Sequence, residues 1–112
     1  MIKQLLAIFI LSLSALEAKP YVVTSFSILG DVVKNVAGEH CDVESIVGPN
    51  GDTHVFQPTP ATSQMILKSN LVIMNGLGFE PWLNRLLEAM QYKGIVIEAS
   101  KGPTKALTPL IA

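Results

Sequence analysis

The chain has 112 residues, 49% of them hydrophobic, and a formal net charge of −1 at pH 7. This composition is typical of a globular domain. Its lysines and arginines are scattered, so no basic surface for nucleic acid is predicted. Cys41 is the single cysteine, which excludes an internal disulfide. We interpret Cys41 as a small buried hydrophobe near the start of a strand, with a reactive thiol as the alternative.

Residues 1–18 have the features of a secretory signal peptide. Lys3 supplies the positive charge, residues 5–16 form an apolar run, and Ala18 is a plausible last residue to be removed. The apolar run is too short to cross a bilayer, which takes about 20 residues. A retained anchor or a buried helix is the alternative. No cysteine lies directly after the run, so we expect no lipid anchor. We expect residues 19–112 to form one small domain in an exported compartment.

Beyond this leader, strand-like and helix-like segments alternate along the chain. Thr59 followed by Pro60 is a typical helix start, Ser27 is a possible cap, and Gly38 is a typical helix end. Alternating strands and helices of this length predict an α/β fold, a four-stranded parallel sheet flanked by helices. Strands are expected at residues 21–25, 43–47, 71–74 and 95–97, and helices at residues 28–37, 60–68 and 82–90.

The loop at residues 48–58 follows the second strand and contains His54. Ligands of parallel sheets bind outside the carboxyl ends of the strands, so His54 lies on the expected binding edge. It could be a ligand for zinc or another divalent metal. By spacing alone, an ordinary loop histidine bonded to a backbone carbonyl is favoured, because no other His, Cys or acid lies at ligand spacing. His40, at the opposite end of the same strand, is expected to be a solvated turn residue.

Two carboxylates near this edge are further candidates, as metal ligands or as acid–base groups. Asp52 lies in the same loop as His54, and Glu80 precedes Pro81 at the start of a helix. The simpler interpretation of Glu80 is a favourable charge at the helix N-terminus. The two glycines of residues 75–80 are too few for a dinucleotide fingerprint, and no nucleophile-elbow motif is present. The sequence therefore gives no reason to expect an enzyme.

Three segments, at residues 23–31, 47–60 and 70–83, resemble a known family in their order and spacing. The most specific are the His-x-aromatic-x-Pro-Thr-Pro run that starts at His54 and the Asn-Gly-Leu-Gly-x-Glu run that ends at Glu80. They resemble the metal-binding lipoproteins and periplasmic proteins that serve zinc and manganese ABC importers, the cluster A-I solute-binding family. A signal peptide without a lipid-anchor cysteine is similar to the periplasmic branch of that family.

The resemblance implies that His54 is the first metal ligand of a two-lobe protein that binds its ion between the lobes. In the family, the other ligands are a second histidine later in the N-terminal lobe, then a histidine or glutamate and an acidic residue from the second lobe. The sequence ends at Ala112 before any of these. We therefore expect residues 19–112 to be an incomplete N-terminal lobe that binds metal weakly or not at all. Thr53 replaces the proline common before that histidine in the family.

The function that the resemblance implies is capture of a divalent metal, zinc or manganese, in the periplasm. The ion would be passed to a cognate ABC permease in the inner membrane by a protein that is monomeric at full length and binds no nucleic acid. One alternative is a degenerate fragment that acts as a structural or adhesion module without metal transport. Another is a small exported metal-dependent hydrolase, which would need a second ligand that the sequence lacks.

Overall fold

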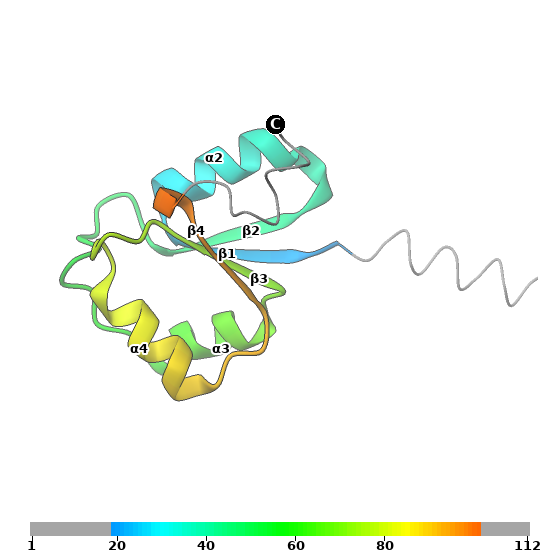
Figure 1. Cartoon of the computed structure of the whole chain (residues 1–112). Helices are drawn as coiled ribbons and strands as arrows, with labels where there is room; N and C mark the ends of the chain where they lie inside the picture. Colours follow the sequence, from blue (N-terminus) through cyan, green and yellow to red (C-terminus); the bar gives the residue numbers. More distant parts are fainter. Residues whose placement is uncertain (1–18, 102–112) are drawn as a thin grey trace, which may run out of the picture.

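A computed structural model describes residues 19–101, which form alternating strands and helices (Figure 1). The predicted signal peptide at residues 1–18 and the last part of the predicted lobe, residues 102–112, lie outside the described residues. Two short 3-10 turns, η1 (Gly38–His40) and η2 (Ala99–Lys101), follow a helix and the last strand. The strands are β1 (Tyr21–Phe26), β2 (Asp42–Val47), β3 (Leu71–Met74) and β4 (Ile95–Glu98), and the α-helices are α2 (Ser27–Ala37), α3 (Pro60–Lys68) and α4 (Pro81–Met90).

The four strands form one parallel sheet in the order β2-β1-β3-β4. In its register, Val22 of β1 pairs with Val43 of β2 on one side and with Leu71 of β3 on the other. The chain runs from β1 to the β2 edge and then returns across β1 to β3, so the topological switch point lies between β1 and β3. Ligands of such sheets bind beside this point, at the carboxyl ends of the strands. The predicted fold class, a four-stranded parallel sheet flanked by helices, is confirmed.

The helices lie on both faces of the sheet, α2 on one face and α3 and α4 on the other (Figure 1). The main core lies on the α3 and α4 side, because apolar side chains of β1 and β3 meet the inner faces of those helices there. Burial of these side chains is the main source of stability. The core consists of Val23, Val47, Ile66, Val72, Met74, Trp82, Leu83 and Leu87.

Local signals mark the start of α3 and the end of α2, but not the start of α2. Thr59 caps α3 in a reciprocal pair with Thr62, and Gly38 ends α2 with a φ of 57°. Ser27, however, does not cap α2. The helix includes Ser27 itself, and the cap position is taken by Phe26, whose side chain makes no capping bond. The strand therefore continues one residue further than predicted and passes directly into the helix.

The α2 face of the sheet is only partly covered. Ile95 and Ile97 of β4 align with Leu71 and Ile73 of β3 on this face, and they are 65% and 43% exposed. Parallel sheets are normally covered on both faces, so these side chains mark an apolar surface. Within residues 19–101, the helices are too short or too polar to span a membrane.

Candidate metal centre

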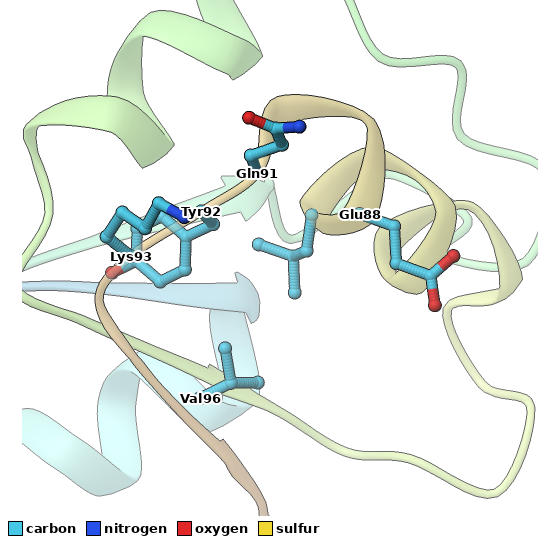
Figure 2. A pocket seen from close by; sticks show the side chains of 6 residues that line it. Glu88, Gln91, Tyr92, Lys93 and Val96 are labelled. Carbon is cyan, nitrogen blue, oxygen red and sulfur yellow. The ribbon is translucent and has the colours of Figure 1, made fainter.

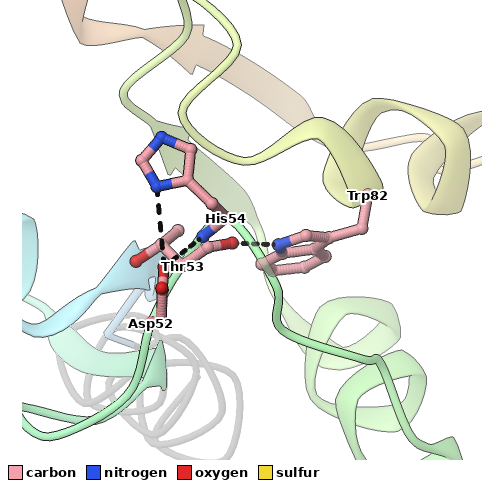
Figure 3. A network of polar contacts seen from close by, with 4 residues as sticks. All are labelled: Asp52, Thr53, His54 and Trp82. Atoms are coloured by element: carbon pink, nitrogen blue, oxygen red, sulfur yellow. Dashed lines mark hydrogen bonds and ion pairs between the residues drawn. The ribbon is translucent and has the colours of Figure 1, made fainter.

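His54 lies in the loop between β2 and α3, at the carboxyl edge of the sheet, and its side chain is 58% exposed. The neighbouring carboxylate of Asp52 contacts it twice, as Figure 3 shows. Asp52 Oδ1 accepts the backbone N–H of His54 at 2.9 Å and lies 3.5 Å from the Nδ1 atom of its ring. The structure thus brings together two of the candidate residues from the sequence, and it leaves the imidazole open to solvent.

The residue between them is fixed by a buried bond from α4. Trp82 Nε1 donates a hydrogen bond of 2.7 Å to the backbone carbonyl of Thr53 (Figure 3). The indole is 5% exposed, and its ring lies 4.9 Å from that of Phe56, centroid to centroid. The chain is therefore held to the core at the position immediately before His54. No local pattern indicates this contact, because its partners are 29 residues apart.

Two phenylalanines complete the surroundings of the imidazole. The ring of Phe79, from the loop after β3, lies edge-on to the His54 ring with centroids 4.7 Å apart. Phe79 in turn packs at 4.8 Å against Phe26, at the end of β1. His54 is thus placed against residues that flank the topological switch point between β1 and β3.

Glu80 has a structural role. It is 2% exposed, and its two carboxylate oxygens accept the backbone N–H groups of Asn75 and Gly76 at 2.9 and 2.7 Å. Its side chain makes no capping bond to α4. The carboxylate therefore closes its own loop, and it is not placed toward His54 as a second ligand. The signal for such a tight loop was the glycine pair, since Gly76 and Gly78 both have positive φ angles.

A pocket of about 500 Å³ lies beside His54, at the carboxyl edge. Its lining includes Asp52, Thr53 and Phe79, although His54 does not line it. A second pocket, of about 460 Å³, lies between the end of α4 and β4 and contains neither histidine (Figure 2). The second pocket is lined by Leu87, Glu88, Gln91, Tyr92, Lys93 and Val96. Since none of these is a histidine, the pocket beside His54 is the better candidate for a metal ion.

The other titratable residues lie elsewhere. Within residues 19–101, no group of three or more His, Cys, Asp and Glu side chains could hold a metal ion. His40 is exposed in η1, as predicted, whereas Cys41 is partly exposed and not buried as we expected. Burial and the hydrogen bond that its hydroxyl donates to Glu44 raise the pKa of Tyr21 to about 12. That pair lies toward the amino end of the sheet, away from His54.

The sequence matches known metal-binding proteins. The model of the family described as "Zinc-uptake complex component A periplasmic" matches residues 22–109. The manganese-binding lipoprotein MntA of Halalkalibacterium halodurans is 46% identical over 67 residues, which are 60% of this chain and 22% of that protein. The iron-binding protein YfeA of Yersinia pestis is 36% identical over 70 residues, 62% of this chain and 22% of that protein.

Solved structures are similar over most of the chain. The periplasmic zinc-binding protein TroA of Treponema pallidum has a TM-score of 0.71 and 25% identity, over 80% of this chain and 32% of that one. The Mn-bound periplasmic metal-binding protein of Candidatus Liberibacter asiaticus has a TM-score of 0.68 and 31% identity, over 77% and 32%.

The chain therefore spans about a fifth of the length of the curated relatives described above, and about a third of these solved structures. The family model, in contrast, matches most of the chain. It describes metal-uptake components and not enzymes, which agrees with the absence of an enzyme signature in the sequence. The chain belongs to the family of periplasmic component A proteins of zinc-uptake complexes.

Proposed function

We propose that the chain is the N-terminal lobe of a solute-binding protein that captures a divalent metal ion, zinc or manganese, for an ABC importer. The observation that carries the proposal is the exposed imidazole of His54 at the carboxyl edge of the sheet, in a chain of this family. The metal ion is the cargo, so His54 has only to bind and release it.

Relatives named for several different metals support the capture of a metal ion as the general function. Those described above are named for manganese, iron and zinc, so kinship alone does not choose the ion. Imidazole nitrogen suits several divalent transition metals, zinc and iron among them, whereas manganese prefers oxygen ligands, so the ligands other than His54 would choose between zinc and manganese. The family description supports a location in the periplasm, and relatives named as ABC transporter substrate-binding lipoproteins support an ABC permease, in the inner membrane, as the partner. We expect the full-length receptor to act as a monomer.

One imidazole is not a complete site. Zinc sites usually have four ligands, and His54 is not part of any group of three candidate ligands within residues 19–101. We therefore expect the 112-residue chain to bind zinc weakly. The family resemblance implies that the other ligands are a second histidine of the same lobe and two residues of a second lobe.

Isothermal titration of zinc and manganese tests this function. It compares the 112-residue chain with the same chain extended through the reading frame that follows it. We expect tight binding only in the extended protein, and its loss in His54→Ala. The matched control is His40→Ala, which removes the exposed histidine at the other end of β2 and should leave binding unchanged. Absence of binding in both proteins would contradict metal capture, and tight binding by the 112-residue chain would contradict an incomplete site.

A further inference from the structure

The His54 ring is held on one side by a carboxylate. Asp52 Oδ1 lies 3.5 Å from Nδ1, and the same oxygen accepts the backbone N–H of His54 at 2.9 Å. The hydrogen bond from the backbone N–H keeps this oxygen next to the imidazole, because it links the Asp52 side chain to the backbone that carries the ring. Figure 3 shows both contacts on the same side of His54. Nδ1 is therefore the ring nitrogen that faces a hydrogen-bond acceptor.

An aromatic neighbour, Phe79, restricts the orientation of the His54 imidazole. Phe79 lies edge-on to the imidazole at 4.7 Å, and Phe79 is itself packed against Phe26. These contacts restrict rotation of the imidazole away from Asp52. Within residues 19–101, Nε2 of His54 has no hydrogen-bond or ion-pair partner, so it is the nitrogen that is open to a ligand.

We propose that Asp52 is a positioning residue, which holds His54 in the tautomer with its proton on Nδ1 and leaves the Nε2 lone pair for the metal ion. A neutral imidazole donates from one nitrogen and accepts at the other, so an acceptor beside Nδ1 favours a proton there. In many metal sites a carboxylate orients the histidine by accepting the N–H of the ring nitrogen that does not bind the metal. The inference rests on the proposed function, and it assigns Asp52 a role other than that of a metal ligand.

Both side chains are well exposed, at 58% for His54 and 63% for Asp52, so water competes for the contact. We therefore expect a shift in the tautomer ratio of about threefold and not a complete switch. Long-range proton–nitrogen NMR of the labelled 112-residue chain measures this ratio without any metal. The ratio is measured at about pH 9, and His40, which has no ion-pair partner within residues 19–101, is an internal reference.

Three variants separate charge from loop geometry. Asp52→Ala should return the tautomer ratio of His54 to that of His40. Asp52→Asn retains an acceptor for the backbone N–H of His54, so it should keep the loop and part of the ratio. Asp31→Ala removes another exposed carboxylate that lines the same pocket, and it should change nothing. A His54 ratio equal to that of His40 in the unsubstituted chain, or unchanged in Asp52→Ala, would overturn the inference.

Zinc chloride, added in excess at about pH 7, then identifies the donor atom. We expect zinc to shift the Nε2 resonance of His54 in the unsubstituted chain and to affect both nitrogens in Asp52→Ala. Binding through Nδ1 in the unsubstituted chain overturns the positioning role, although metal capture by His54 would stand. If the tautomer ratio responds to Asp52 but zinc leaves both His54 nitrogens unchanged, then the proposed ligand role of His54 fails instead.

Discussion

The loops after β2 and β3 meet at the same edge of the sheet but are held in different ways. The loop at residues 75–80 is closed from inside by Glu80, whose buried carboxylate accepts two of its backbone N–H groups. The loop at residues 48–59 is longer and mostly exposed, and Thr53 in its middle accepts a hydrogen bond from the buried indole of Trp82. The closed loop uses the carboxylate of Glu80 to bind its own backbone, whereas the exposed loop carries His54, whose imidazole is open to solvent.

The two loops are also connected in sequence and in space. Glu80 ends the closed loop, residues 75–80, where α4 begins, and Trp82 lies in the first turn of that helix. The closed loop therefore places the indole, and the indole places Thr53 and hence His54. His54 is therefore positioned through residues that are distant from it in the chain. We expect substitutions in the closed loop to disturb the exposed loop, and substitutions in the exposed loop to leave the closed loop unchanged.

The largest effect is expected at Glu80. Glu80→Ala removes two hydrogen bonds to a carboxylate and leaves the backbone N–H groups of Asn75 and Gly76 without partners. Bonds to charged groups contribute about 1.5–3 kcal/mol each, so we expect the free energy of unfolding to fall by about 3 kcal/mol. Urea unfolding measures the loss. Glu80→Gln, which keeps one acceptor oxygen and the same shape, should lose about half as much. Equal stability of all three proteins would show that Glu80 does not close the loop.

Trp82→Phe should loosen only the exposed loop, residues 48–59. The phenyl ring keeps the apolar packing, but the carbonyl of Thr53, a residue that is 5% exposed, loses its donor. An unsatisfied buried group costs about 1–3 kcal/mol, so we expect a loss of about 2 kcal/mol. Amide hydrogen exchange should become faster in residues 48–59 and stay unchanged in residues 75–80. Faster exchange in both loops would contradict the one-way dependence.

The fold was predictable because its signals are local. Apolar runs marked each of the four strands, and Thr59 with Pro60 marked the start of α3 at the observed residue. The start of α2 was predicted one residue late, because Ser27 has a capping side chain but the backbone turns into the helix at Phe26. Residue type indicates that a cap is possible, while the direction of the chain as it leaves β1 decides whether it forms.

The candidate site was predictable only in part. The position of His54 at the carboxyl edge follows from the order of strands and loops, and the structure places it there. The partners of the site do not follow from the sequence. The Thr53–Trp82 bond and the contact of Phe79 with His54 join loops that are distant in the chain. The inward direction of Glu80 depends on the positive φ angles of its loop, which sequence spacing does not determine.

Two glycines sharpen the description of the closed loop. Gly76 and Gly78 have φ angles of +83° and +74°, which an alanine adopts at a cost of about 1 kcal/mol. A Cβ atom at Gly78 would meet open space, whereas one at Gly76 would lie 2.6 Å from Ser100 Oγ and 2.9 Å from Glu98 Oε2. We expect thermal unfolding to show a loss of about 1 kcal/mol for Gly78→Ala and about 1.5 kcal/mol for Gly76→Ala. A larger loss at Gly78 would contradict this packing.

The smallest effect is expected on β1, the strand that separates β2 and β3. Ser25, near its carboxyl end, is fully buried, and within residues 19–101 its Oγ atom has no hydrogen-bond partner. A buried hydroxyl without a partner is unfavourable, so Ser25→Ala should raise the free energy of unfolding by about 0.5–1 kcal/mol.

The neighbouring hydroxyl provides the matched control. Thr24 Oγ1 bonds to Ser45 Oγ at 2.8 Å and to the carbonyl of Phe26 at 3.1 Å, so Thr24→Val should lower the free energy of unfolding by about 1 kcal/mol. Urea unfolding of the two variants should therefore give changes of opposite sign at adjacent buried positions. If Ser25→Ala lowers stability as well, then Ser25 has a partner in solution, and the central strand contributes a polar contact beneath the two loops.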